Sequence, residues 1–211
     1  MIWATASSRE HSLQLVCTTP NKQTGVHSHQ INILLLVEDM WRCLADFTQP
    51  STAGMAFRSI DDRVMGGVSL SNFVSRDSQG GCFSGTVTTD RNGGFCSCSA
   101  DTNLDLTGAR TLRVTTAKAD KPGQYKISLR DPYALDNQIS WQSEFVAGVE
   151  SGSHELPLVD FTPRSRGRAV PDCPPLDLEN IVSVGFMLSV IRQEINQPGP
   201  FALWIAKICA K

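Results

Sequence analysis

The sequence has no apolar stretch long enough to cross a membrane as a helix, which requires about 20 residues. Its longest strongly apolar run, Ile33-Leu34-Leu35-Leu36-Val37, ends at Glu38 and Asp39. A large charge of one sign is also missing, because 19 Lys and Arg residues stand against 21 Asp and Glu residues, a formal net charge of -2. No global field that would hold nucleic acid or an anionic membrane is therefore expected. The sequence predicts a protein that is soluble or peripheral to a membrane.

Sequence patterns of several enzyme classes are absent as well. The chain has no Gly-x-Ser-x-Gly nucleophile elbow and no Rossmann glycine fingerprint. Met65-Gly66-Gly67 lacks the Lys-Ser/Thr ending of a phosphate-binding loop. His154 is the only histidine of residues 41–211, and a surface histidine or one with satisfied hydrogen bonds is favoured over a catalytic base. We therefore predict no catalytic residue, no cofactor and no enzyme activity.

The cysteine content does not fit a disulfide framework. Seven cysteines are an odd number, their spacing is irregular, and no Asn-x-Ser/Thr glycosylation site accompanies them. Cys96 and Cys98 form a Cys-x-Cys pair, but no second pair or nearby histidine completes a four-ligand zinc site. On a strand both would share one face with Ala100, as small core residues do. The sequence predicts reduced thiols and no metal site.

Two regions differ in their apolar patterns. Residues 1–40 are predicted to be an irregular N-terminal extension, rich in Ser and Thr at its start, with a weak likeness to an organelle transit peptide. Leu34, Val37, Trp41 and Leu44 recur at helical spacing and favour one short amphipathic helix. We place a single domain at residues 41–211, since one core is more economical than two in a chain of 211 residues with 41% hydrophobic residues.

Short alternating or apolar runs separated by Gly and Pro turns fill the domain. This pattern, without strand-helix alternation, predicts an all-β fold in the form of an antiparallel jelly-roll β-sandwich. In the last strand Phe201, Leu203 and Ile205 share one face and Trp204 and Ile208 the other, so a central strand covered on both faces is expected. The predicted strands are residues 68–74, 82–88, 95–99, 111–116, 125–129, 139–145, 154–158, 181–190 and 201–208.

A motif of two aspartates, an arginine and two glycines opens the strand region, in Asp61-Asp62-Arg63-Val64-Met65-Gly66-Gly67-Val68-Ser69. Adjacent residues on an extended segment point to opposite sides, so Asp61 and Asp62 cannot easily flank one scissile bond, and a structural role is favoured. The second Gly-Gly site, Asn92-Gly93-Gly94, suits a hairpin between residues 86–88 and the strand that starts at Phe95. We interpret both Gly-Gly sites as turns, and an exposed loop of this kind could also be where a partner docks.

Three arginines alternate in Arg164-Ser165-Arg166-Gly167-Arg168. On an extended segment they would present three guanidinium groups on one side. One hypothesis is that Asp61 or Asp62 holds one of these arginines in a bidentate ion pair. The other is that the loop contacts a partner protein, because arginine is common in interface hot spots as well as in buried pairs. The sequence leaves both hypotheses open.

Four segments together resemble the complex I intermediate-associated protein 30 family. The resemblance covers about Leu44 to the C-terminus and implies a galactose-binding-domain-like jelly roll. The segments are Asp61-Asp62-Arg63-Val64-Met65-Gly66-Gly67-Val68-Ser69, Asn92-Gly93-Gly94-Phe95, Phe161-Thr162-Pro163-Arg164-Ser165-Arg166-Gly167-Arg168 and Gly199-Pro200-Phe201-Ala202-Leu203-Trp204-Ile205.

The resemblance also implies a function. It implies a non-enzymatic assembly factor or chaperone that binds protein subunits, or other assembly factors, of mitochondrial NADH:ubiquinone oxidoreductase (complex I), with no cofactor and no nucleic acid. Related domains occur in bacterial and plastid proteins, some linked to photosystem biogenesis. A plastid photosynthetic complex is therefore an alternative client, and plastid or cytoplasm an alternative to the mitochondrial location.

The main alternative of a different class is a carbohydrate-binding module, which the same fold could serve. Trp141 would then stack on a sugar ring. It shares a predicted strand face with Ile139 and Phe145, which favours a core position. An exposed Trp or Tyr platform would favour sugar binding, whereas a buried Trp141 and an exposed arginine loop would favour protein binding.

Overall fold

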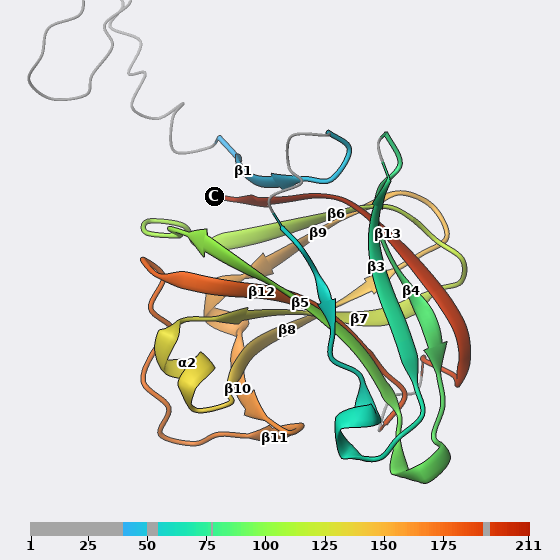
Figure 1. The fold of residues 1–211 in the computed structure, drawn as a ribbon. Coiled ribbons are helices and arrows are strands. Elements are labelled where there is room, and N and C mark those ends of the chain that lie inside the picture. The colour runs from blue at the N-terminus through green and yellow to red at the C-terminus, as the bar shows by residue number, and fades with distance from the viewer. Residues whose placement is uncertain (1–39, 50–54, 77, 192–194) are drawn as a thin grey trace, which may run out of the picture. The chain divides into compact units, whose positions relative to one another are not determined.

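The computed structural model describes residues 40–49, 55–76, 78–191 and 195–211. Residues Arg42–Lys211 form one compact unit. Its regular structure consists of antiparallel strands in two sheets, and the only α-helix in the described ranges is the short α2 (Pro132–Asp136) (Figure 1). The predicted all-β antiparallel sandwich is confirmed.

One sheet has six strands, with β13 at its centre. β13 pairs with β4 through its first half and with β6 through its second half, while β1 pairs with its last residues. In spatial order the strands are β3 (Leu70–Arg76), β4 (Gly80–Val87), β13 (Gly199–Ala210), β6 (Thr111–Ala119) and β9 (Gly152–Pro157), with β1 (Arg42–Asp46) beside β13.

The other sheet has seven strands, and short strands form both of its edges. The central strand β7 alternates between buried and partly buried residues, as expected for a sheet with one face on the core, whereas β12 is buried at four successive residues, 183–186. In spatial order the strands are β11 (Arg168–Ala169), β10 (Thr162–Ser165), β8 (Ser140–Ala147), β7 (Gly123–Arg130), β12 (Ile181–Ser189), β5 (Phe95–Leu104) and β2 (Arg58–Ser59).

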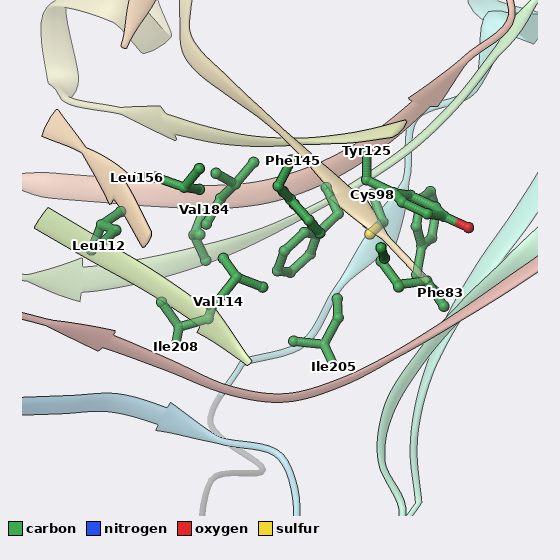
Figure 2. Close-up of a cluster of buried hydrophobic side chains, with 14 of the residues drawn as sticks. Phe83, Cys98, Leu112, Val114, Tyr125, Phe145, Leu156, Val184, Ile205 and Ile208 are labelled. Atoms are coloured by element: carbon green, nitrogen blue, oxygen red, sulfur yellow. The ribbon is translucent and has the colours of Figure 1, made fainter. Parts of the chain in front are cut away.

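The core lies between the two sheets and takes side chains from both. Figure 2 shows Phe83, Ile205 and Ile208 of the six-stranded sheet facing Phe145 and Val184 of the other sheet. Each of these side chains is at most 5% exposed. Removal of this apolar surface from water is the main favourable contribution to the stability of such a domain.

Every predicted strand overlaps a strand of the structure, but four short strands were missed. β1, β2, β10 and β11 have between two and five residues and therefore too little alternation to be recognised. Leu44, at the end of the predicted helical pattern, lies in β1, so the helix does not extend to this residue. Leu34 and Val37 lie outside the described residues.

β13 is central, as predicted, but only one of its faces packs on the core. Phe201, Leu203 and Ile205 are buried, whereas Trp204 is partly exposed on the other face, with the Lys118 ammonium 4.5 Å from its ring centroid. The register between β13 and β6 shifts between Ile205 and Lys207. This irregularity turns Ile208 onto the inner face, so the prediction of a second covered apolar face is wrong.

Candidate functional site

Asp61 is buried and joins the edges of the two sheets. Its carboxylate accepts hydrogen bonds from the backbone N–H of Ser71 in β3 (2.7 Å), from the Ser71 hydroxyl (2.6 Å) and from the N–H of Ser97 in β5 (3.1 Å). β3 is the terminal strand of the six-stranded sheet, and β5 is next to the terminal strand β2 of the other sheet. Hydrogen bonds to an ionised acceptor are stronger than neutral ones. Asp61 therefore holds the two sheets together at this edge.

Asp62 is the first residue of a 3₁₀ helix at Asp62–Met65 and is also buried. Its carboxylate accepts hydrogen bonds from the backbone N–H groups of Ser69 (2.9 Å), Gly94 (2.7 Å) and Phe95 (3.3 Å). Burial acts to raise the pKa of Asp62, but the hydrogen bonds from Ser69, Gly94 and Phe95 together outweigh burial and hold this pKa below its usual value. The side chain thus stays ionised and fixes two loops to each other.

The glycines of both Gly-Gly sites make room for the Asp62 carboxylate. A Cβ atom on Gly67 or on Gly93 would overlap the Asp62 side chain. Gly66 and Gly94 have φ angles of 92° and 139°, which side chains rarely allow. Each of the four glycines therefore has either a steric or a conformational reason to lack a side chain.

The predicted hairpin at Asn92-Gly93 is wrong. The strand before it, β4, belongs to the six-stranded sheet, whereas β5 after it belongs to the seven-stranded sheet. The connection therefore crosses from one sheet to the other through a 3₁₀ helix at Asp90–Asn92, with Asn92 in the left-handed region at φ 59°. The hydrogen bonds from Gly94 and Phe95 to Asp62 fix the end of this crossing.

An open apolar groove of about 360 Å³ lies on the outside of this arrangement. Ile60, Val64 and Leu70 line the groove and are exposed, Val64 at 72%. Met65 and Val68 of the same segment are exposed as well, Met65 at 64%. Several exposed apolar side chains in one short segment commonly mark an interaction site. We call this surface the signature patch and define it as Ile60, Val64, Met65, Val68 and Leu70.

The sequence motif pointed to this loop, but not to the apolar surface that it carries. Three lining residues of the groove, Asp61, Arg63 and Val64, belong to the motif, and Leu70 follows directly after it. The aspartates and glycines of the motif form structural contacts. The signal that was available was the presence of Val64, Met65 and Val68 among the polar and glycine residues of the motif.

The three arginines of the 164–168 loop do not lie on one side. Arg166 and Gly167 form the two-residue turn of the β10–β11 hairpin, with φ angles of 50° and 77°. Arg164 pairs with Ala169 and Ser165 pairs with Arg168, so Arg164 and Arg168 point to opposite faces of the hairpin. The prediction of three aligned guanidinium groups is therefore wrong, because the segment turns instead of remaining extended.

The hypothesis of an ion pair between this loop and Asp61 or Asp62 is also wrong. The β10–β11 hairpin forms one edge of the seven-stranded sheet, and β2, next to the aspartates, forms the opposite edge (Figure 1). Both carboxylates have backbone and serine donors instead. At the tip of the hairpin, Arg166 is exposed and donates a hydrogen bond to the Gln138 side chain (3.3 Å).

Trp141 points into the sandwich and offers no sugar-stacking surface. It pairs in register with the buried Leu129 of β7, and paired residues of neighbouring strands face the same side. It packs against the core from its partly buried position on β8. The predicted core position of Trp141 is confirmed.

Cys96, Cys98 and Ala100 are buried on one face of β5, as predicted. Burial raises the pKa of Cys96 to about 12 and raises the pKa of Cys98 further, so neither thiol forms a reactive thiolate near neutral pH. The described cysteines are free. Within the described ranges, no group of three or more His, Cys, Asp or Glu side chains is arranged to hold a metal ion. No helix there is long and apolar enough to span a membrane.

His154 lies on β9, where one ring nitrogen contacts Thr116 and the ring packs against Phe145. Its Nε2 atom is 3.1 Å from the Thr116 hydroxyl, and its ring centroid is 4.9 Å from that of Phe145. Burial lowers the pKa of His154 below the usual histidine value. These contacts agree with the predicted histidine that has satisfied hydrogen bonds.

Lowering the pH should destabilise the protein through His154. A histidine whose folded-state pKa is lowered binds its proton more readily in the unfolded chain, so stability is complete above about pH 6.5 and falls as the pH approaches the folded-state pKa. Urea unfolding midpoints measured from pH 7.5 to pH 5 should therefore decrease. His154→Gln should have a flatter profile over this interval, and an identical profile in the two proteins would contradict the assignment.

Comparison with known proteins identifies one family and one fold. The model of the family described as Complex I intermediate-associated protein 30 (CIA30) matches residues 45–205. An uncharacterized protein of Schizosaccharomyces pombe is 30% identical over 172 residues, which cover 73% of this chain and 77% of that protein.

The family 11 carbohydrate-binding module from Clostridium thermocellum, solved in complex with a mixed-linked tetrasaccharide, has a TM-score of 0.54 at 20% identity, over 81% of this chain and 94% of the module. A solved agarase has a TM-score of 0.51 at 13% identity, over 81% of this chain and 24% of the agarase. The two structural likenesses concern the fold, in agreement with a jelly-roll sandwich.

Proposed function

Because the chain belongs to the complex I intermediate-associated protein 30 family, we propose that it is a non-enzymatic assembly factor that binds protein subunits, or other assembly factors, of NADH:ubiquinone oxidoreductase. The family match includes the signature patch and both sheets of the sandwich. Such a role requires a surface that holds a partner and later releases it, without a cofactor. We propose the mitochondrion, where complex I is assembled, as the location of this role.

The exposed signature patch is the observation that carries this proposal. Its apolar side chains sit on a loop whose backbone is fixed by the buried Asp61 and Asp62. Arg63, which is exposed and lines the same groove, adds a charged group beside the apolar surface. Apolar centres with arginine close by are typical of protein interfaces. We infer that the occupant is an apolar segment of a partner polypeptide.

Two observations argue for protein binding over the alternative of carbohydrate binding. Trp141 faces the core, so it supplies no stacking platform. The arginine hairpin has exposed side chains at Arg166 and Arg168, which was the second feature expected of a protein-binding domain. The likeness to the carbohydrate-binding module is limited to the fold, and a fold can support unrelated functions.

Affinity capture from detergent-solubilised mitochondrial membranes tests the proposal. The wild-type protein should enrich complex I subunits, identified by mass spectrometry. The double variant Val64→Asp with Met65→Asp should lower this enrichment at least tenfold, because two charges would be buried at the interface. Its thermal stability should stay close to wild type, since both side chains are exposed in the free protein.

Val159→Asp is a matched control, because Val159 is a highly exposed apolar residue on the separate 3₁₀ helix Leu158–Asp160. This variant should retain full capture. Absence of complex I subunits from the wild-type capture would argue against the proposed function. Equal capture by wild type and the double variant would instead keep the function and place the contact surface elsewhere.

A further inference from the structure

The outer face of the seven-stranded sheet carries two arginines in one row. On β7, the outward residues Ser128 and Arg130 alternate with the buried Ile127 and Leu129. Leu129 pairs with Trp141 of β8, so Arg130 is level with Ser140, which in turn pairs with Arg164 of β10. The three strands are direct neighbours, as Figure 1 shows. Since adjacent strands lie about 4.8 Å apart, the Cα atoms of Arg130 and Arg164 are separated by about 10 Å.

Neither arginine has a counter-ion of its own. No ion pair or hydrogen bond of the Arg130 or Arg164 side chain occurs within residues 40–49, 55–76, 78–191 and 195–211. Along the same row, Arg130 pairs with Ser183 of β12, and Ser183 pairs with Asp101 of β5. The Asp101 carboxylate is already bound by Arg58 at 2.7 Å.

Arg130 is partly buried, and burial alone lowers its pKa. A guanidinium that has lost water without gaining a carboxylate destabilises the folded state. On the same face, Lys126 has a partner, because its ammonium lies 2.9 Å from the Glu144 carboxylate. On the outer face of this sheet, Lys126 and Arg58 thus have carboxylate partners, whereas Arg130 and Arg164 have none within the described residues.

We propose that Arg130 and Arg164 bind a phosphate monoester on the outer face of the seven-stranded sheet. Each guanidinium can bind two oxygen atoms at once, and two such groups approach the ligand from either side of Ser140. A single carboxylate has only two oxygens and one charge. A phosphate monoester has three terminal oxygens and a charge between about -1.5 and -2 at neutral pH, which matches two guanidinium groups.

The residues around the two arginines suit this ligand. Ser140 lies between the two arginines, and its hydroxyl accepts a hydrogen bond from the Gln142 side-chain amide (2.7 Å). Thr162 of β10 pairs with Gln142 of β8. Next to Arg130 on the other side is Ser183, which is buried and has its hydroxyl 2.8 Å from that of Ser99. Ser140 and Ser183 are buried, so the exposed Thr162 and the partly exposed Gln142 are the polar groups available to the organic part of the ester.

Calorimetric titration of the full chain with phenyl phosphate tests the site directly. Wild type should bind it, and sulfate or chloride at the same ionic strength should bind more weakly. Arg130→Gln and Arg164→Gln should each weaken binding at least tenfold. Arg130→Lys keeps the charge but loses the planar fork, and should fall between wild type and Arg130→Gln. Arg58→Gln, which removes a paired arginine from the same sheet, should leave binding unchanged.

The phosphate could belong to a soluble molecule or to a lipid headgroup, and vesicle sedimentation separates these sources. Arginine-dependent binding to phosphatidic acid vesicles, but not to phosphatidylcholine vesicles, would identify the lipid, whereas binding of phenyl phosphate alone would identify a soluble ester. Failure of wild type to bind either form would overturn the proposal. So would an equal loss of binding in Arg58→Gln.

A stability measurement without ligand provides a second test. Arg130→Met removes the uncompensated charge and keeps the apolar stem, so the melting temperature should rise by about 3 °C. Added phosphate should raise the melting temperature of wild type but not that of Arg130→Met. A lower melting temperature in the ligand-free variant would contradict the assignment of Arg130 as an unpaired charge.

Discussion

Replacement of Asp62 by Ala is expected to lower the free energy of unfolding by about 3–5 kcal/mol. The Asp62 carboxylate accepts hydrogen bonds from three backbone N–H groups, those of Ser69, Gly94 and Phe95. Removal of the carboxylate leaves these buried N–H donors without an acceptor, and each such donor costs about 1–3 kcal/mol. Urea denaturation followed by circular dichroism would measure the change as a lower midpoint.

Asp101→Ala is the matched control, because Asp101 is also an aspartate with a polar partner, Arg58, but its side chain is 74% exposed. Its loss should cost less than about 1 kcal/mol, as for other surface ion pairs. The lowered pKa of Asp62 adds an acid-dependent signature, since its contribution is present above about pH 3.9 and is lost as the pH falls through the folded-state pKa. Asp62→Ala variants with wild-type stability would show that the two loops are held by other contacts.

Replacement of Phe83 by Ala is expected to have an effect of similar size, about 3–5 kcal/mol. Phe83 lies on β4, is completely buried, and belongs to the core cluster in Figure 2. Its ring packs edge-to-face on Phe201, with ring centroids 5.0 Å apart. The truncation removes apolar contacts and leaves a cavity that the surrounding sheets can fill only partly. Thermal or urea unfolding would give the change in stability.

Tyr133→Ala provides the comparison for this core substitution, because Tyr133 is an aromatic residue of α2 that is about half exposed. Its truncation should change the free energy of unfolding by much less, and Phe83→Leu should fall between the two. Similar losses in Phe83→Ala and Tyr133→Ala would mean that the core between the sheets is not the main source of stability.

The fold was predictable where the sequence repeats a simple pattern. Cys96, Cys98 and Ala100 alternate with polar residues on β5, and their inward orientation follows from the two-residue period of a strand. The same period placed Trp141 in the core. The two-residue period gave the wrong face for the end of β13, because the register shift near Ile205 changes which face the later residues occupy. Nothing in the local sequence marks that shift.

The candidate sites were harder to predict from the sequence, because they depend on pairing between distant segments. The partners of Asp62 lie seven to 33 positions away, in a loop and a sheet crossing that a single sequence does not bring together. The unpaired Arg130 became visible only when the register of three strands was known. Gly167 could have been recognised as a turn residue, since glycine adopts positive φ at no steric cost.

The hydrogen bonds of Asp61 and Asp62 also affect how a partner would associate. A flexible loop loses conformational entropy when it binds, and this loss subtracts from the affinity. Val64 and Met65 are displayed on a loop that is already anchored at both ends, by Asp61 to β3 and β5 and by Asp62 to Ser69 and Gly94. Most of that ordering is complete before any partner arrives. In the role proposed above, this ordering would let a small apolar surface contribute useful affinity.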